Sequence, residues 1–187
     1  RSCQRCPLAE TRTHAVYGRG DPRFPLWFIG EAPGRDEDKQ GFAFVGRAGR
    51  LLDLCLNKKG ITEYFISNVV KCRPPENRDP TDDEMRACIP WLVVQLANYN
   101  PRVIVAMGRY SIGYFLGFTY EETRKMTVGK QVGKIQPYLG ALNDLGIMPT
   151  YHPAYLLRNA EATKGFIRQI DRANKLCQRL LDKQQRS

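Results

Sequence analysis

The N-terminal stretch SCQRCPL places Cys3 and Cys6 with two residues between them, a spacing that serves several cysteine chemistries. Such a pair forms a thiol–disulfide redox couple, part of a disulfide framework, or half of a metal site. The redox interpretation is the weakest, because the pair precedes any predicted helix and lacks a thioredoxin-like strand before it. The pair alone leaves the other two chemistries open.

The whole chain has an even number of cysteines, which is compatible with a disulfide framework. The six are Cys3, Cys6, Cys55, Cys72, Cys88 and Cys177. Disulfide scaffolds are usually small, secreted and dense in cysteine, whereas this chain has 187 residues. We therefore expect reduced thiols and a cytoplasmic location.

Three further polar residues lie within or directly after short apolar runs. Glu31 follows LWFIG, Asn68 lies inside YFISNVV, and His152 ends GIMPTYH. A buried amide needs hydrogen-bond partners, so Asn68 is either a satisfied structural residue or a reader of a ligand. A lone histidine near a strand end is more often structural than catalytic, but His152 stands at the end where ligands bind.

The elements that would position these residues alternate along the chain. Apolar runs predict buried strands at 26–32, 64–70, 102–108 and 146–152, and helical patterns fall at 46–60, at 81–99 and near the C-terminus. This alternation predicts an α/β fold, in which a mostly parallel sheet of about four strands has helices on both faces. We expect residues 1–187 to form a single three-layer domain, with ligands at the carboxyl ends of the strands.

The loop GEAPGRDEDKQGFAFVG (30–46) follows the first predicted strand. It is not a phosphate-binding loop, because it lacks a Gly-Lys-Ser/Thr ending and its acidic residues oppose a phosphate. Phe44 stands in this polar loop, where an aromatic ring either anchors the loop in the core or stacks on a ligand. After His152, Leu156 and Leu157 are either core residues or an exposed apolar wedge.

The charge of the chain favours anionic partners. Lys and Arg number 29 and Asp and Glu 19, giving a net charge of +10, and nucleic acid is the first candidate. No single basic block dominates, so solubility or a membrane-facing patch explains the charge as well. No apolar run is long enough to span a bilayer, and the start at Arg1 indicates a trimmed N-terminus.

Three motifs occur in the order GEAPGRDEDKQGFAFVG, SNVVKCRPPENR and HPAYLLR. Together with the cysteines they resemble the family-four uracil-DNA glycosylases, the iron–sulfur branch of the uracil-DNA glycosylase superfamily. The resemblance runs from Cys3 to about Arg158. It implies that the protein flips deoxyuridine out of single- or double-stranded DNA and hydrolyses its N-glycosidic bond, which begins base excision repair. We expect a monomer without a lyase step.

The resemblance also implies a [4Fe–4S] cluster, held by Cys3, Cys6, Cys72 and Cys88. Four thiolates suit an iron–sulfur cluster and zinc equally well, so structural zinc remains the alternative. We expect the cluster to have a structural role, in which it joins the N-terminal segment to residues 72–88.

The resemblance further assigns roles in binding the base. His152 would donate to uracil O2, and the Asn68 amide would pair with the O4 and N3–H edge and thereby reject cytosine. Phe44 would stack on the flipped base. Glu37 would lie near uracil C5, where the methyl group of thymine would clash.

Other assignments concern the water and the DNA backbone. Ala32 stands where the best-known uracil glycosylases carry an aspartate. Glu31 beside it is the candidate that positions water or counters the sugar cation. The backbone amides of Glu31 and Ala32 would line the pocket. Leu156 or Leu157 would fill the space left by the flipped base, and Arg158 would contact phosphate. Ala43 replaces a proline that many family members have before the stacking phenylalanine.

Three alternatives belong to other classes or specificities. A zinc-stapled nucleic-acid-binding protein without catalysis explains the charge and the cysteines, but not the polar residues at three successive strand ends. A related branch bonds covalently to uracil through a histidine in an inserted basic loop, yet no insertion follows NVVKCRPP and the only other histidine is His14. Excision of another deaminated base, such as hypoxanthine, stays open.

Overall fold

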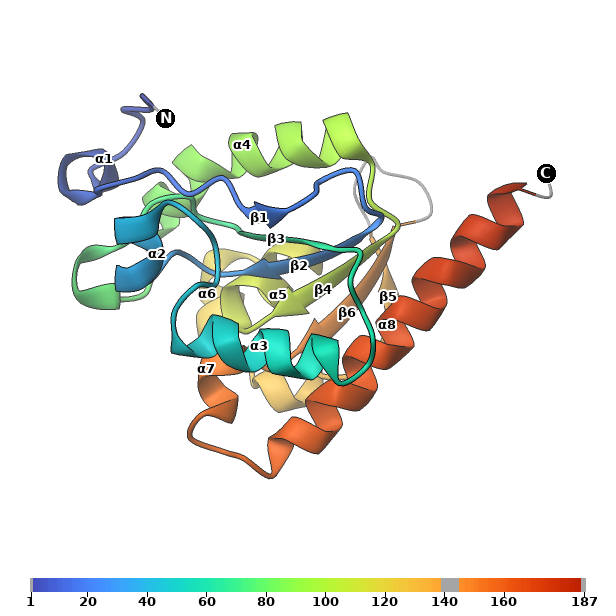
Figure 1. Cartoon of the computed structure of the whole chain (residues 1–187). Coiled ribbons are helices and arrows are strands. Elements are labelled where there is room, and N and C mark those ends of the chain that lie inside the picture. Colours follow the sequence, from blue (N-terminus) through green and yellow to red (C-terminus); the bar gives the residue numbers. More distant parts are fainter. Residues whose placement is uncertain (1, 139–144, 186–187) are drawn as a thin grey trace.

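The computed structural model describes residues 2–138 and 145–185, in which helices cover both faces of a six-stranded sheet (Figure 1). The strands are β1 (Arg19–Gly20), β2 (Leu26–Gly30), β3 (Phe65–Asn68), β4 (Val103–Met107), β5 (Gln136–Pro137) and β6 (Gly146–Thr150). Their order is β1-β3-β2-β4-β6-β5, with the four central strands parallel and the two edge strands antiparallel. The predicted α/β class is confirmed.

The four predicted strands are the four parallel ones, each shorter than the apolar run that indicated it. The expectation of about four strands missed β1 and β5 at the edges. Each of these has only two residues, which is too short for an alternating pattern to be recognised.

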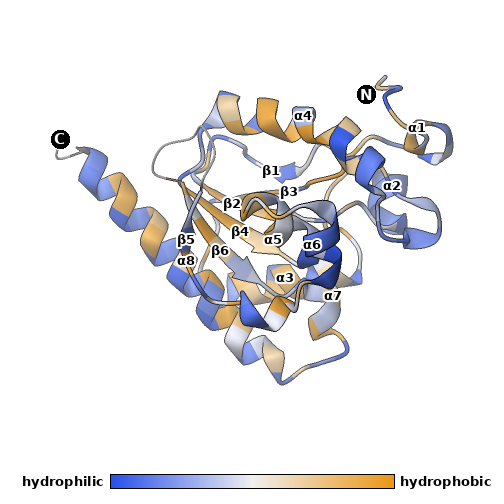
Figure 2. Cartoon of the chain, turned by 180° about the vertical axis from the view of Figure 1, so that it is seen from behind, coloured by the Kyte–Doolittle hydropathy of each residue, from blue (hydrophilic) through white to orange (hydrophobic). Residues whose placement is uncertain are grey.

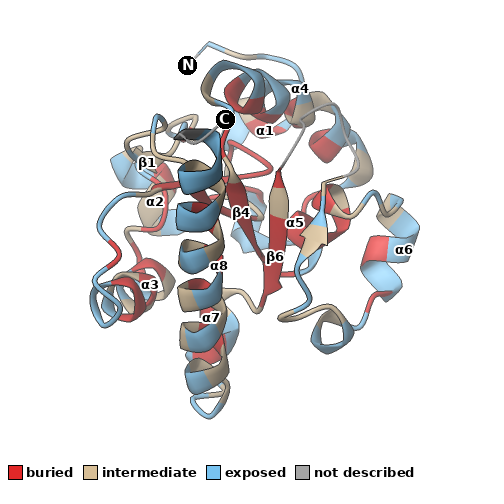
Figure 3. Ribbon diagram, turned by 90° about the vertical axis from the view of Figure 1, so that its right-hand side faces the viewer, coloured by how far each residue is buried: buried red, intermediate tan, exposed pale blue. Residues whose placement is uncertain are grey.

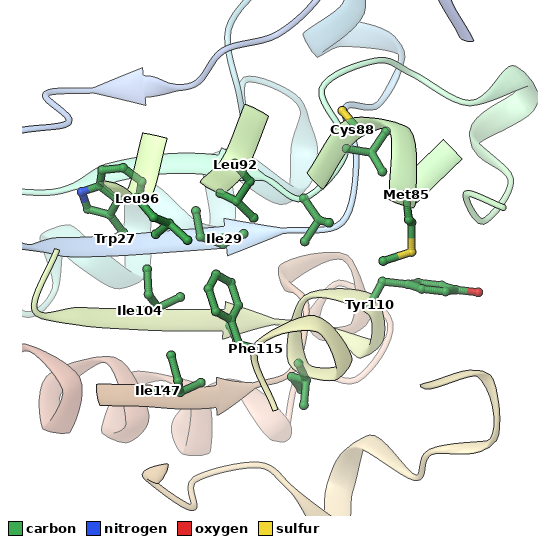
Figure 4. Close-up of a cluster of buried hydrophobic side chains, with 14 of the residues drawn as sticks. Trp27, Ile29, Met85, Cys88, Leu92, Leu96, Ile104, Tyr110, Phe115 and Ile147 are labelled. Carbon is green, nitrogen blue, oxygen red and sulfur yellow. The ribbon is translucent and has the colours of Figure 1, made fainter. Parts of the chain in front are cut away.

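Strand β2 shows how the sheet supports two cores. Its side chains point alternately to opposite faces, so Trp27 and Ile29 join one buried cluster and Leu26 and Phe28 the other. Figure 4 shows Trp27 and Ile29 in the first cluster, on the sheet face that α4 and α5 cover. Figure 2 shows the concentration of hydrophobic residues in the central strands.

The first face is covered by α4 (Asp82–Tyr99) and α5 (Arg109–Phe115), and the second by α3 (Arg47–Asn57) and α8 (Ala162–Gln185). The outward face of α8 is largely exposed (Figure 3). Within the described ranges, no helix combines the length and apolar character needed to cross a membrane. The shorter helices are α1 (Leu8–Thr11), α2 (Arg35–Gln40), α6 (Tyr120–Lys125), α7 (Pro153–Leu156) and the 3₁₀ helices η1 (Pro75–Asn77) and η2 (Val128–Lys130).

Helix α4 begins with a capping box. Thr81 Oγ1 accepts a hydrogen bond from the Glu84 N–H at 3.2 Å, and Glu84 Oε2 accepts one from the Thr81 N–H at 2.8 Å. The helix continues through Pro90 to Tyr99. The capping residues therefore set the start of the helix that carries Cys88.

The carboxyl ends of the parallel strands meet at one edge of the sheet. Gly30 at the end of β2 pairs in register with Asn68 at the end of β3. Strand β6 ends at Thr150, two residues before His152. The loops that carry the candidate residues therefore begin side by side, where ligands bind in open α/β sheets.

Candidate active site

A cavity of about 430 Å³ opens at this edge of the sheet, within the size range of small-molecule sites. Its walls combine the loops after β2, β3 and β6 with the start of α3. Seven of the residues singled out from the sequence line it: Glu31, Ala32, Glu37, Phe44, Asn68, His152 and Arg158. Segments more than 100 residues apart in the chain thus meet around one cavity.

Asn68 brings an unpaired hydrogen-bond acceptor to this cavity. The residue is only 1% exposed, and its Oδ1 atom has no hydrogen-bond partner within the part of the chain that the structure describes. A Cβ atom on Gly30 would lie 2.6 Å from both Asn68 Oδ1 and Phe44 Cζ, so glycine makes room for both. Because a buried acceptor without a partner is costly, this amide is suited to a ligand that donates to it.

His152 presents a neutral ring to the cavity. Its Nδ1 atom accepts a hydrogen bond from the Ala154 N–H at 3.1 Å, which leaves the proton of the neutral ring on Nε2. Burial lowers the pKa of His152 to about 4, so the ring is uncharged at pH 7. The ring centroids of His152 and Phe44 are 5.4 Å apart. A neutral N–H donor and an aromatic ring therefore stand together.

Phe44 is held in a backbone conformation that bulky residues rarely adopt. Its φ angle is +55°, and its side chain is 5% exposed. The structure describes four non-glycine residues with positive φ, and two of them, Phe44 and Asn77, line the cavity. Such conformations cost about 1–3 kcal/mol and concentrate at functional sites.

Gly49 in α3 allows the backbone of Phe44 to take this position. A Cβ atom at Gly49 would lie 1.8 Å from the carbonyl oxygen of Phe44 and 2.2 Å from its carbonyl carbon. No side chain fits there without movement of the loop. The close approach therefore fixes where the Phe44 ring lies.

We expect Gly49→Ala to lower the free energy of unfolding by about 1–3 kcal/mol, because it forces the Phe44 backbone away from α3. The matched control is Gly165→Ala in α8, where a Cβ atom would meet only Arg168 Nη2 at 3.9 Å. Thermal unfolding of both variants measures the difference. Equal melting temperatures would show that the contact with Phe44 does not constrain the loop.

The Glu37 carboxylate holds two parts of one loop together through hydrogen bonds. Its Oε2 atom accepts a hydrogen bond from the Gly34 N–H at 3.1 Å, and its Oε1 atom accepts one from the Gly46 N–H at 2.8 Å. The first bond caps α2, and the second holds the residue before α3. Both carboxylate oxygens therefore fix the segment that contains Phe44, while the side chain also lines the cavity.

Glu31 has an environment that disfavours its charge. Burial, and after it the negative charge of Asp79, raise the pKa of this carboxyl to about 7, while Arg109 acts in the opposite direction. A carboxyl group with such a pKa changes charge near neutral pH, as expected for a group that takes part in proton chemistry.

The structure separates the two leucines that follow His152. Leu156 is 2% exposed and packs in the core between the sheet and helices α3 and α8. Leu157 is 43% exposed, and Arg158 next to it is exposed and lines the cavity. Only Leu157 of the pair has the exposure that a wedge into DNA requires.

Sequence reasoning gave no role to three further residues of the cavity wall, Asn77, Arg78 and Tyr155. Arg78 makes two hydrogen bonds to Glu84, at 2.8 and 2.6 Å, which fasten the loop to the start of α4. In the sequence, the run RPPENR predicts a loop here, because its two prolines restrict the backbone. Nothing in that run alone identifies which side chains reach the cavity.

The four cysteines proposed as ligands lie in one region, beside α4. Cys3, Cys72 and Cys88 line a second cavity of about 820 Å³, and Cys6 packs against the core cluster that contains Cys72 and Cys88. Burial raises the pKa of Cys72 and raises that of Cys88 to about 11. Charge on Cys6 contributes to both increases, so these thiols are within electrostatic reach of one another.

Two observations bear on what these cysteines could hold. In the described part of the chain, no group of three or more His, Cys, Asp or Glu side chains is arranged to bind a single metal ion. Arg12 Nη1 donates to Cys72 Sγ at 3.2 Å, and the Lys71 N–H donates to Cys88 Sγ at 3.1 Å. Donors of this kind stabilise thiolates and the sulfur ligands of clusters.

Comparison with known proteins identifies the family. The uracil DNA glycosylase superfamily matches residues 17–175. A type-4 uracil-DNA glycosylase of Thermotoga maritima is 43% identical over 161 residues, covering 85% of this chain and 80% of that protein. Type-4 uracil-DNA glycosylases of Sulfurisphaera tokodaii and Saccharolobus solfataricus are 43% and 41% identical, covering 87% and 88% of this chain and 74% and 76% of theirs. The chain belongs to the type-4 uracil-DNA glycosylases of the uracil DNA glycosylase superfamily.

Proposed function

We propose that this protein hydrolyses the N-glycosidic bond of deoxyuridine in DNA, releasing uracil and leaving an abasic site. One observation carries the proposal: a buried, unpaired amide oxygen on Asn68 faces the same cavity as a neutral His152 and the ring of Phe44. Membership of the type-4 family supports it. All of these residues belong to one chain, so we propose that a monomer is active.

The cavity provides groups that match the edge of uracil. Asn68 Oδ1 accepts from N3–H and its amide donates to O4, while cytosine presents an acceptor and a donor in reversed places. A fixed amide therefore leaves polar groups unpaired when cytosine enters. Stacking on Phe44 adds about 1–3 kcal/mol for a flipped base. Glu37, held by two backbone N–H groups, keeps the Phe44 loop in place and occupies space near C5.

Bond cleavage places negative charge on the leaving uracil and positive charge on the sugar. The Nε2–H group of His152 donates to uracil O2, where negative charge grows, and needs no change of protonation to do so. The carboxylate of Glu31 stabilises the sugar cation and orients the water that attacks C1′. Water supplies the hydroxyl of the abasic sugar, and its proton leaves through Glu31 or solvent to neutralise the uracil anion.

We expect the single-turnover rate of excision to rise with pH around an apparent pKa near 7. The active form of Glu31 is its carboxylate, and burial raises the pKa of this group to about 7, so acidification removes the active form. The pKa of His152 is about 4, so its protonation adds no step above pH 5. Rates at saturating enzyme from pH 5 to 9 provide the measurement.

The variant Asp79→Asn tests the cause of this profile. It removes a negative charge that raises the pKa of Glu31, so the midpoint should move to lower pH while the plateau rate stays similar. Asp83→Asn, at an exposed position in the first turn of α4, is the matched control. A flat profile between pH 6 and 8 would contradict the role of the Glu31 carboxylate.

The base must leave the helical stack to enter this cavity, at a cost of a few kcal/mol. We propose that Leu157 fills the vacated space and that Arg158 contacts the phosphate backbone. The exposure of both side chains next to the cavity supports this assignment. The burial of Leu156 among α3, α8 and the sheet supports the choice of Leu157 over Leu156.

We propose further that Cys3, Cys6, Cys72 and Cys88 hold a [4Fe–4S] cluster. A tetrahedral zinc site with Zn–S bonds of about 2.3 Å needs its sulfurs about 3.8 Å apart, whereas each cysteine of a cluster binds a different iron. Three of these cysteines line one cavity, and Cys6 packs against the core cluster that contains Cys72 and Cys88, which supports a shared site. The choice of iron–sulfur over zinc rests on the resemblance to the family-four enzymes. The cluster would join the N-terminal segment to α4. We propose a reducing, intracellular location, because cysteines that hold a cluster must stay reduced.

Anaerobically purified protein should contain about four iron atoms per chain and absorb visible light as iron–sulfur proteins do. Cys72→Ser and Cys88→Ser should lose most of this iron and melt at lower temperature, because metal binding is coupled to folding. Cys55→Ser, a buried cysteine of the opposite core, is the control. One zinc per chain in place of iron would establish the alternative.

The proposed reaction is tested by its products. Incubation with an oligonucleotide containing one uracil should release free uracil, detectable by mass spectrometry, and leave DNA that breaks only after alkaline treatment. Breakage without alkali would reveal a lyase step, and a protein covalently attached to the DNA would indicate the branch that bonds to uracil. Release of hypoxanthine from a matched oligonucleotide that contains this base, at a rate comparable with uracil release, would show that the specificity is not for uracil alone.

A further inference from the structure

Lys71 is a buried lysine that the proposed reaction does not use. The residue is 7% exposed and lies between Asn68 and Cys72 in the chain. Its Nζ atom donates to Ser67 Oγ at 2.8 Å, to the Asn68 carbonyl oxygen at 2.7 Å and to Gln95 Oε1 at 2.5 Å. Three acceptors match the three N–H bonds of an ammonium group. Burying such a group is costly unless it is fully hydrogen-bonded, as it is here.

These bonds join segments that are far apart in the sequence. Ser67 Oγ donates to the carbonyl oxygen of Tyr17 at 2.7 Å, and Gln95 Nε2 donates to the same atom at 3.1 Å. Lys71 therefore connects the N-terminal segment, the end of β3 and the middle of α4. Its own backbone N–H donates to Cys88 Sγ at 3.1 Å. The same residue thus contacts a proposed cluster ligand and the residue that reads the base.

The hydrogen bond from Lys71 to the Asn68 carbonyl oxygen bears on how the base is bound. The Asn68 carbonyl points to Lys71, while its side chain lines the cavity with an unpaired Oδ1 atom. A side-chain amide without a protein partner for its oxygen is oriented mainly by the position of its own backbone. Fixing the carbonyl therefore fixes the direction from which the amide meets the base.

We propose that Lys71 is a positioning residue that holds Asn68 in the geometry that selects uracil. This inference rests on the proposed function, because it assigns Lys71 a role only through Asn68. It predicts that losing the Lys71 amino group slows bond cleavage after the base has entered the cavity. It also predicts that this loss of rate occurs only when the Asn68 amide is present.

The test uses Lys71→Met, which keeps an unbranched side chain and removes all three donors. At saturating cluster-loaded enzyme, we expect the single-turnover rate on uracil-containing DNA to fall about 10- to 100-fold, as for a catalytic group displaced by about 1 Å. The enzyme concentration that gives half of the maximal single-turnover rate should change little. The ratio of excision at uracil to excision at cytosine should also fall. Lys125→Met, at an exposed position of α6, is the control.

A double-mutant cycle separates positioning from a general structural role. In an Asn68→Ala background, Lys71→Met should cause no further loss, because the group that Lys71 positions is absent. Equal losses in both backgrounds, or losses that only follow a fall in iron content, would overturn the inference. If Lys71→Met fails to fold, Gln95→Met replaces it in the test, because it keeps the Lys71 amino group and removes one of its acceptors. We expect Gln95→Met to cause a smaller loss of excision rate, again only when the Asn68 amide is present. An inactive wild-type protein would instead refute the proposed function.

Discussion

Replacing His152 with alanine is expected to slow single-turnover uracil excision by about 10²- to 10³-fold, the usual cost of losing one preorganised donor to a developing anion. His152 meets the requirements of such a donor. The Ala154 N–H fixes its Nδ1 atom as an acceptor, and a pKa of about 4 keeps the ring neutral. Rates measured at saturating enzyme isolate the chemical step from DNA binding.

The control for this variant is His14→Ala, since His14 is the other histidine and is absent from the cavity wall. His14 Nδ1 forms a hydrogen bond with the Asp38 carbonyl oxygen at 2.7 Å, so its loss affects only local structure. Melting temperatures of both variants show whether either loss of rate follows from unfolding. A His152→Ala protein that is folded and keeps its rate within about threefold would remove His152 from the mechanism.

Replacing Asn68 with alanine is expected to reduce excision by about 10²-fold or more and to weaken discrimination against cytosine. Both effects have one cause, because the same amide pairs with uracil and opposes the reversed donors and acceptors of cytosine. The unpaired Oδ1 atom means that the folded protein loses no internal hydrogen bond at that oxygen. We therefore expect the melting temperature to change less than the rate does.

Asn57→Ala, at an exposed position at the end of α3, provides the matched control. Excision should be measured on oligonucleotides that differ only in uracil or cytosine at one position. An Asn68→Ala protein with unchanged discrimination would show that selection resides elsewhere, for example in the walls formed by Glu37 and Phe44.

The parallel strands and the residues at their carboxyl ends could be predicted from the sequence, because buried strands are short continuous apolar runs and Asn68 or His152 interrupts or ends such a run. Edge strands could not, since β1 and β5 have two residues each and owe their structure to pairing with β3 and β6. Their pairing is a property of the folded sheet, and no local pattern records it.

The cavity itself was less predictable than the residues that line it. Leu156 and Leu157 are identical in type, and only the placement of α7 against α3 buries the first and exposes the second. Cys88 shares a helical face with Met85 and Leu92, which predicts a core residue, and its contact with the Lys71 N–H emerges only when α4 packs beside β3. The hydrogen bonds of Glu37 to Gly34 and Gly46 likewise depend on how the loop folds back.

The central claim is that one cavity, lined by Asn68, His152 and Phe44, excises uracil from DNA. The most direct test incubates excess cluster-loaded protein with end-labelled oligonucleotides that carry one uracil, one cytosine or one thymine, followed by alkali. We predict strand breaks at uracil alone, strongly slowed in His152→Ala and Asn68→Ala. A folded, iron-containing protein that breaks none of them, or variants as fast as the wild type, would contradict the account.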